Sequence, residues 1–242
     1  MKYFTKEWFK LGQKISFHLN IEEEKKAETF SEAFFKQLYN QELMNWVNLR
    51  EEMASIGSEA FNKEEATEEF HNAFIVRQII LKKELPESIL EQIADLRVFA
   101  LDKATNKVIN ALIKFCVENE RAVTTIGENY RKYFKEVHTS FDKEIVENFR
   151  FHDCTILESI HNDTNLTLKI DNTGGFTDID EVTFENFHVI KQDGSLEDTW
   201  WLYEEVYKVN DKYEFHVLLE NRENELLDFI ISANRVFFYR KK

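Results

Sequence analysis

Residues 200–207 read WWLYEEVY and residues 213–219 read YEFHVLL, with the turn dipeptide Asn210-Asp211 between them. Runs of aromatic and β-branched residues on both sides of such a turn are typical of an antiparallel hairpin. We therefore predict two paired strands here, which give the chain a β-sheet near its C-terminus.

The pairing of this hairpin follows from the length of its loop. A loop with an even number of residues places Glu205 opposite His216, and it directs Glu204 to the other face, opposite Val217. The neighbours of Glu204 on that face are apolar, and a carboxylate buried there without a partner is costly. Three interpretations stay open: Glu204 bonds a buried Arg or Tyr, lies at the rim of the sheet, or forms the floor of a cleft between the two halves of the chain.

The hydrophobic pattern changes near Phe149, from a period of about 3.6 residues to a period of about 2. We therefore predict an all-helical domain over residues 1–148 and an antiparallel β domain over residues 149–242. Short strands at regular spacing favour a sheet, a sandwich or a half-barrel. The expected fold class is α+β, with an N-terminal helical bundle packed on a C-terminal antiparallel β-sheet or sandwich.

Individual elements follow from the same spacing rule. The first helix should begin after Thr5 and carry apolar residues as far as Leu19, and Pro86 should lie in the first turn of a helix that reaches Phe99. Further helices are expected over 30–38, 43–57, 70–85, 108–116, 130–137 and 143–146, and strands over 154–157, 166–170, 182–190, 200–207, 213–219, 226–232 and 236–239.

The charge of the chain is acidic and uneven. The 242 residues carry a formal net charge of −14, and residues 151–242 alone carry 19 acidic and 9 basic side chains, a net charge of −10. Nonspecific nucleic-acid binding needs clustered Lys and Arg, so we expect no nucleic-acid partner. A hydrophobic share of 43% with 22 Phe provides ample material for one or two cores.

Cysteine use and the N-terminal sequence indicate a cytoplasmic protein. Cys116 and Cys154 lie far apart in apolar surroundings, so we expect two core thiols and no disulfide. The first eight residues, MKYFTKEW, contain neither an uninterrupted apolar stretch nor a small-residue cleavage site, so no signal peptide is expected. No stretch approaches the length of a transmembrane helix, and no membrane partner is expected.

Four residues form the candidate catalytic set: His152, Asp153, Glu205 and His216. A carboxylate beside an imidazole raises the histidine pKa and can orient the ring as a base. If all four side chains converge, they also offer the ligand types that zinc or a similar ion takes. The structural alternative is a stabilising cross-strand Glu–His pair and a local hydrogen-bonding group at a strand start. The metal and any cofactor stay unassigned.

Four residues form the candidate binding set: Glu204, Trp201, Tyr203 and Tyr207. The three aromatic residues should share one face of the hairpin with Glu205. Aromatic side chains on an exposed face ringed by acids are typical anchors of a protein interface. If the helical half covers that face, they are core residues instead.

Other sequence motifs give weaker evidence of function. Glu68-x-x-His71 has the spacing used in di-iron helical bundles, but no second helical unit of this kind exists, so a solvated acidic face is the better interpretation. The sequence has no GxSxG, GxxxxGK[ST], GxGxxG or HExxH. Their absence weighs against the commoner hydrolases, P-loop NTPases and dinucleotide-binding proteins.

The start MKYFTKEW, the triplet His152-Asp153-Cys154 and both arms of the hairpin resemble a bacterial family catalogued as a domain of unknown function (4085), found largely in Bacillus-type Firmicutes. The likeness spans nearly the whole chain and is most specific in the hairpin. It implies a cytoplasmic bacterial protein and transfers no activity, cofactor or catalytic residue. The β half also resembles, in architecture alone, small bacterial immunity-type sandwich modules, which act by binding.

The first functional hypothesis is a non-enzymatic module whose acidic, aromatic β face binds a protein or peptide. The second is a metal-assisted hydrolase or small-ligand enzyme with a site between the helical and β halves, using His152, Asp153, Glu205 and His216. The third is an acidic mimic of nucleic acid, which requires carboxylates along one exposed ridge. The absence of a complete catalytic motif favours the first.

Overall fold

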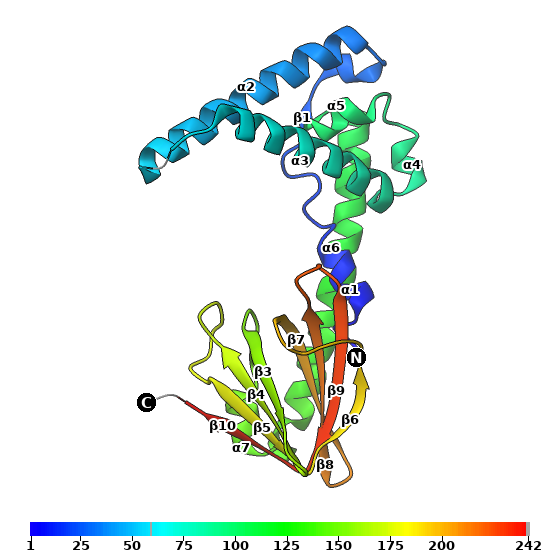
Figure 1. The fold of residues 1–242 in the computed structure, drawn as a ribbon. Helices are drawn as coiled ribbons and strands as arrows, with labels where there is room; N and C mark the ends of the chain where they lie inside the picture. The colour runs from blue at the N-terminus through cyan, green and yellow to red at the C-terminus, as the bar shows by residue number, and fades with distance from the viewer. Residues whose placement is uncertain (59, 241–242) are drawn as a thin grey trace. The chain divides into compact units, whose positions relative to one another are not determined.

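The computed structural model describes residues 1–58 and 60–240 (Figure 1). The chain divides into two compact units, one formed by Met1–Gly12 with Arg121–Lys242 and the other by Gln13–Glu120. We call the first the sheet unit and the second the helical unit. The α+β fold class is confirmed, because the helices lie mostly before residue 149 and the large sheet lies after it.

The boundary between the two units does not fall at residue 148, where the last helix ends and the strands follow. The dividing point lies inside the long helix α6 (Asn106–Val137), so the last part of α6 belongs with the sheet. Helix α1 (Lys6–Gly12) belongs with the sheet as well. The division therefore follows packing, whereas the sequence pattern follows the change of secondary structure.

Helical boundaries differ from the expected ones for local reasons. The helix expected to reach Leu19 ends at Gly12, a residue that disfavours helix. The expected helices 30–38 and 43–57 are one helix, because no Gly or Pro separates them. The helix expected from Pro86 to Phe99 is two, since the side chain of Asp95 accepts from the amide of Arg97 and caps a new start.

The helical unit also contains one short strand pair, so the N-terminal part of the chain is not purely helical. β1 and β2 pair in parallel. The core of the unit is built on buried apolar side chains that include Phe74, Val98 and Leu112, and it holds Cys116 as a free thiol. Its elements are β1 (Glu22–Glu23), η1 (Lys25–Glu28), α2 (Glu32–Gly57), α3 (Lys63–Glu84), α4 (Glu87–Leu90), α5 (Leu96–Ala100), β2 (Lys103–Ala104) and the first part of α6.

The sheet unit contains one antiparallel sheet with the strand order β10-β5-β4-β3-β7-β8-β9-β6. The single strand expected over 182–190 is in fact two, because Asn186 adopts a positive φ of 51° and the chain crosses to the opposite edge. The remaining elements are η2 (His138–Ser140), α7 (Lys143–Asn148), β3 (Thr155–His161), β4 (Asn165–Asp171), β5 (Glu181–Glu185), β6 (His188–Gln192), β7 (Thr199–Val209), β8 (Lys212–Glu220), β9 (Leu226–Ala233) and β10 (Arg235–Tyr239).

This sheet curls around its own core. Phe184 of β5 and Phe215 of β8 belong to strands four positions apart, which would lie about 19 Å apart in a flat sheet. Their ring centroids are nevertheless 5.3 Å apart. Phe149, directly after α7, packs against both rings, with its centroid 4.5 Å from that of Phe215 and 6.4 Å from that of Phe184. The β half is therefore a single curled sheet, close to a half-barrel, and not a two-sheet sandwich.

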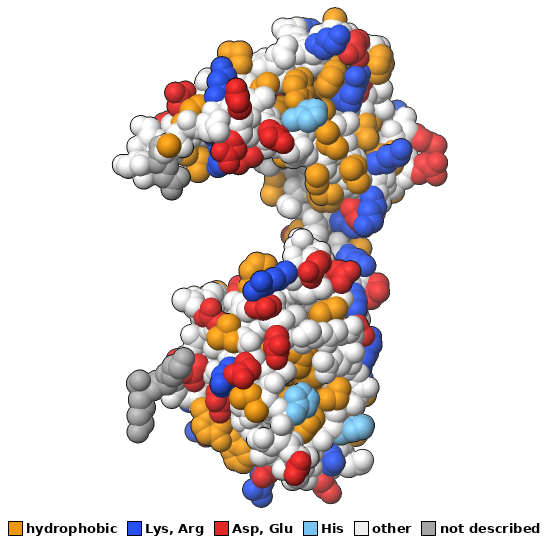
Figure 2. Space-filling model, viewed as in Figure 1, with side chains coloured by type: hydrophobic (Ala, Val, Ile, Leu, Met, Phe, Trp, Pro, Cys, Tyr) orange, Lys and Arg blue, Asp and Glu red, His pale blue; other side chains and the backbone are white. Residues whose placement is uncertain are grey.

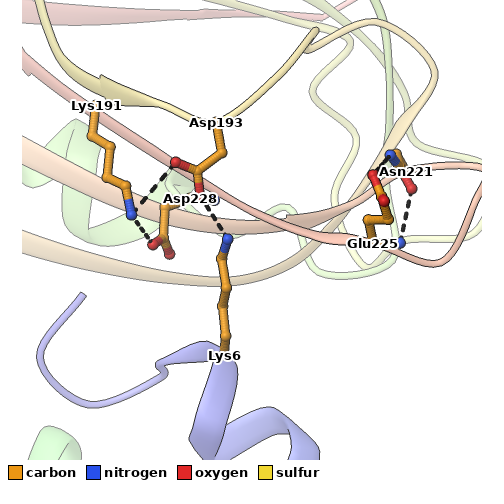
Figure 3. A network of polar contacts seen from close by, with 6 residues as sticks. All are labelled: Lys6, Lys191, Asp193, Asn221, Glu225 and Asp228. Atoms are coloured by element: carbon orange, nitrogen blue, oxygen red, sulfur yellow. Dashed lines mark hydrogen bonds and ion pairs between the residues drawn. The ribbon is translucent and has the colours of Figure 1, made fainter.

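The N-terminal residues are held to the other face of this sheet. Trp8 of α1 donates its indole N–H to the carbonyl of Val123 in α6, at 3.1 Å. Lys6 pairs with Asp193 at 2.6 Å (Figure 3). Asp193 in turn accepts from the amide of Asp228 on β9. The contacts fix α1 beside both α6 and the edge of the sheet.

The structure bears on two further expectations, which concern the state of the cysteines and the presence of a membrane-spanning helix. Cys116 and Cys154 are both buried and free, which confirms that they are core thiols. Among residues 1–58 and 60–240, no helix combines the length and apolar character needed to cross a bilayer.

Candidate functional site

The register predicted for the hairpin is confirmed. Glu205 of β7 lies opposite His216 of β8, and Glu204 lies opposite Val217. The loop contains two residues, and Asn210 takes the positive φ of 56° that such a turn requires. The pairing therefore follows from the turn.

A bulge at Leu202 changes the face of one candidate. Trp201 pairs with Leu219, whereas Tyr203 pairs with Leu218, so Leu202 is an additional residue on β7. Trp201 consequently lies in the core with no exposed surface. The expectation that Trp201 shares a face with Tyr203 and Tyr207 is wrong, because it assumed unbroken alternation along the strand.

The same bulge gives Glu204 its partner. The indole N–H of Trp201 donates to a carboxylate oxygen of Glu204 at 2.8 Å. Burial raises the pKa of Glu204 to about 7, and the bond from Trp201 and the charge of His152 oppose that rise only in part. Glu204 therefore exchanges its proton near neutral pH, and its partner is an indole where an Arg or Tyr was considered.

His152 and Asp153 lie beside this part of β7, just before β3. The Nδ1 atom of His152 is hydrogen-bonded to the carbonyl of Leu202, and a carbonyl can only accept. Nδ1 therefore carries a proton, and Nε2 lies 3.6 Å from a carboxylate oxygen of Asp153. The ring packs against Tyr203 with centroids 4.9 Å apart.

Glu205 has no exposed surface, and four donors surround its carboxylate. Oε1 accepts from the amides of Tyr3 and Phe4 at 2.8 and 2.6 Å. Oε2 accepts from the amide of Lys2 at 2.8 Å and from the hydroxyl of Tyr207 at 2.6 Å. Successive backbone N–H groups converging on one anion form a nest, here occupied by the protein's own carboxylate. Glu205 thus anchors the N-terminal segment.

His216 has a different partner from the one expected. Its Nε2 atom lies 3.1 Å from the carboxylate of Glu214, and burial lowers the pKa of the ring. Of the four candidate catalytic residues, His152 and Asp153 lie side by side, whereas the side chains of Glu205 and His216 bond different partners although their strands are paired. Within the described part of the chain, no three His, Cys, Asp or Glu side chains are grouped so that they could hold a metal ion.

The aromatic face of the hairpin is covered by residues 1–12 and by the end of α6. Tyr203 packs against Trp8 and Phe4 with centroids at 4.7 and 5.4 Å, and Tyr207 packs against Tyr133 at 5.3 Å. Tyr207 is only 4% exposed. These rings form an interior, and they offer little surface to another molecule.

The helical unit contains two surface hollows that were not predicted from the sequence. α2 and α3 lie side by side and antiparallel (Figure 1). The tip hollow, of about 390 Å³, lies where α2 ends and α3 begins. The base hollow, of about 290 Å³, lies further along the pair toward α5. The tip hollow is lined chiefly by Arg50, Met53, Phe61, Glu65, Ala66 and Glu69, and the base hollow chiefly by Glu42, Trp46, Phe70, Ala73, Phe74, Arg77 and Asp102.

Both hollows lie on one face of the helix pair. Their lining positions recur at helical spacing, which keeps them on one side of each helix. Trp46, which lines the base hollow, donates its indole N–H at 3.0 Å to the carbonyl of Ala66, which lines the tip hollow. We call the combined surface the α2–α3 groove. Its positions are 42, 46, 50, 53, 54 and 57 on α2 and 65, 66, 69, 70, 73, 74 and 77 on α3.

The groove has an acidic excess. Arg50 pairs with Glu69 at 3.1 Å, and Arg77 pairs with Asp102, so these four charges compensate one another. Glu42 and Glu65 also line the groove, and no basic side chain of the described residues forms an ion pair with either. The groove therefore presents two uncompensated carboxylates, Glu42 beside the aromatic wall of the base hollow and Glu65 in the more polar tip hollow.

Exposed apolar side chains also lie along α2. Leu49, Met53 and Ile56 are 50%, 53% and 80% exposed and recur at i, i+4 and i+7 on α2. Figure 2 shows further hydrophobic side chains gathered over α3, with acidic side chains toward the end where α2 meets α3. A stripe of this kind, without a covering element, is typical of a surface that binds another molecule.

The model of a family described as Protein of unknown function (DUF4085) matches residues 29–230. The chain belongs to this family. The match covers the α2–α3 groove, all of α6 and the sheet as far as β9, and it begins after the segment that Glu205 holds. A search of the curated proteins and a search of the solved structures returned no match.

Replacing Glu205 with Gln should release the N-terminal segment. Gln has one acceptor oxygen, and its NH₂ group would face the N–H or O–H donors that now bond the second carboxylate oxygen. The free energy of unfolding should therefore fall by about 2–4 kcal/mol. Hydrogen exchange should show faster exchange at the amides of residues 2–4. Glu214→Gln is the matched control on β8, and equal effects of the two substitutions would contradict the anchoring role.

Replacing Glu204 with Gln should flatten the dependence of stability on pH. The pKa of Glu204 is near 4.5 when unfolded and about 7 when folded, so its contribution to stability is fully present below pH 4.5 and is lost as pH rises through 7. The neutral Gln keeps an acceptor for Trp201 and avoids this loss, which amounts to about 3 kcal/mol at most. Denaturant unfolding at pH 5 and pH 8 measures it. Glu223→Gln, at an exposed loop position, is the control, and a pH profile of Glu204→Gln that parallels wild type would refute the shifted pKa.

Proposed function

We propose that this protein is a non-enzymatic binding module that takes up a basic amphipathic helix of a partner protein in the α2–α3 groove. The observation that carries the proposal is the pair of hollows along two antiparallel helices, with an aromatic base hollow and an uncompensated carboxylate in each hollow. Grooves of this form bind helices through apolar anchors placed one or two turns apart.

The spacing of the hollows suits a helical ligand. Ala66 in the tip hollow and Ala73 in the base hollow are seven residues apart on α3, a distance of about 10 Å. Side chains at positions i and i+7 of a bound helix are separated by the same rise. One partner helix lying along the groove can therefore place an anchor in each hollow.

The charge of the groove determines the sign of the partner. Residues 41–69 contain eight acidic and two basic side chains, a net charge of −6. Glu42 lines the base hollow and Glu65 lines the tip hollow, and neither has an ion-pair partner among the described residues. Lys or Arg on the polar face of a bound helix would pair with these carboxylates, and an acidic helix would be repelled.

The surface proposed here replaces the aromatic β face. That face is covered by the protein's own N-terminal residues and α6, so its aromatic side chains are already packed. The resemblance to a bacterial family supports a bacterial and cytoplasmic setting for the module. The net charge of −14 supports a protein partner over a nucleic acid.

A second candidate function is acid–base chemistry on a small ligand at His152 and Glu204. It is favoured by the proton on Nδ1 of His152, which leaves Nε2 as the base when the ring is neutral, and by the pKa of Glu204 near 7. Turnover of ester, amide or phosphoester substrates that disappears in His152→Gln would support it. Equal turnover by wild type and His152→Gln would exclude this pair as the catalytic groups.

The binding function can be tested with a designed peptide. The probe is an 18-residue peptide of Leu and Lys in amphipathic helical order, and the control is the same peptide with Glu in place of Lys. We expect only the Lys peptide to bind in calorimetry and to shift the Trp46 indole N–H signal in NMR spectra. Met53→Asp, and separately Glu42→Lys with Glu65→Lys, should each weaken binding about tenfold or more.

Glu68→Lys is the matched control for these variants, because Glu68 is exposed on α3 outside the groove face. It makes half the charge change of the double variant, so it should have less than half of that variant's effect on the logarithm of the dissociation constant. Equal binding of both peptides, or a Glu68→Lys effect as large as that of the double variant, would contradict the proposal.

A further inference from the structure

The base hollow has the chemistry of a site for an organic cation. Its wall includes the rings of Trp46, Phe70 and Phe74, and the first two have centroids 6.5 Å apart at an angle of 44°. The faces of aromatic rings carry negative electrostatic potential, and they attract ammonium groups within about 6 Å. Glu42 adds a full negative charge at the same wall.

The remaining charges of the hollow argue against an anionic ligand. Arg77 is the basic residue of the lining, and both of its terminal nitrogens bond the carboxylate of Asp102. An anion would have to separate this pair and would also approach Glu42. A cation leaves the Arg77–Asp102 pair intact and finds Glu42 without a basic partner among the described residues.

The helical unit already places cations over aromatic rings. The guanidinium of Arg50 lies 5.6 Å from the ring centroid of Trp46, and that of Arg97 lies 4.1 Å from the centroid of Phe35. The hollow offers the same kind of contact to a cation from outside the chain. Its volume of about 290 Å³ lies at the lower end for small-ligand sites, which suits a head group and a short alkyl stem.

We propose that the base hollow of the α2–α3 groove holds an organic ammonium group, with Trp46, Phe70 and Phe74 around its alkyl part and Glu42 as its counter-charge. The group comes either from a lysine side chain of a bound helix or from a small alkylammonium ligand. In the first case the inference rests on the proposed function of the same groove, and in the second it stands without it.

The first arm of the test uses small probes on the full-length protein. n-Butylammonium and tetramethylammonium are titrated at constant ionic strength, with n-butanol as the neutral control. We expect the ammonium probes to shift the signals of the Trp46 indole and the Phe70 ring, and n-butanol not to do so. Glu42→Gln should weaken this binding about tenfold. Glu51→Gln, at an exposed position of α2 outside the hollow, should leave it unchanged.

The second arm uses the Leu/Lys peptide with its lysines acetylated one at a time. If a lysine side chain is the source, acetylation at one position should weaken binding about tenfold, and Glu42→Gln should remove the difference between the acetylated and free peptides. Peptide binding that no single acetylation changes, together with ammonium probes that behave like n-butanol, would overturn this inference and leave the proposed function standing. Ammonium binding without peptide binding would overturn the proposed function and leave this site standing.

Discussion

The carboxylate of Glu205 holds the backbone of residues 2–4 against β7, and the arrangement of the sheet unit depends on this contact. A fully buried charge is tolerated only with several donors, and three successive amides and the hydroxyl of Tyr207 provide them. Once the amides are fixed, the following residues place Phe4 and Trp8 over Tyr203, and Lys6 reaches Asp193. One anion therefore converts an aromatic sheet face into an interior.

The neighbouring carboxylate, that of Glu204, obtains its hydrogen bond in a different way. The bulge at Leu202 turns Trp201 toward the core, where its indole N–H meets Glu204. Without the additional residue, Trp201 would lie on the opposite face and Glu204 would have no such donor. Two adjacent glutamates thus reach opposite faces of one strand, and each has its own source of hydrogen bonds. The consequence for Glu204 is a pKa of about 7, because burial raises the pKa by more than the indole of Trp201, the charge of His152 and the backbone of Phe151 lower it.

The features that depend on the hydrophobic period and on the length of the turn could be predicted from the sequence. The pairing of Glu205 with His216 follows from the two-residue loop at Asn210, and the change of period near Phe149 marks the start of the strands. The partners of Glu205 could not be predicted, because backbone amides have no signature in side-chain patterns. The bulge at Leu202 also lacks a local Gly or Pro signal. The groove left a weak signal in the sequence, because Leu49 and Ile56 are apolar residues of α2 in addition to those that form its buried stripe.

The aromatic hairpin face of the sheet unit is covered, whereas the α2–α3 groove of the helical unit is open to solvent, and this difference favours the groove as the binding surface. In the sheet unit, Glu204 and Glu205 have internal donors and Tyr207 is covered. In the helical unit, Glu42 and Glu65 line the two hollows without a basic partner among the described residues, and Leu49 and other apolar side chains face solvent. Burying that apolar surface against a partner lowers the free energy of the complex. The carboxylates at its border lose hydration when the partner binds, and this loss is costly unless cations of the partner replace the lost water. A partner that supplies both an apolar face and positive charge meets both requirements at once.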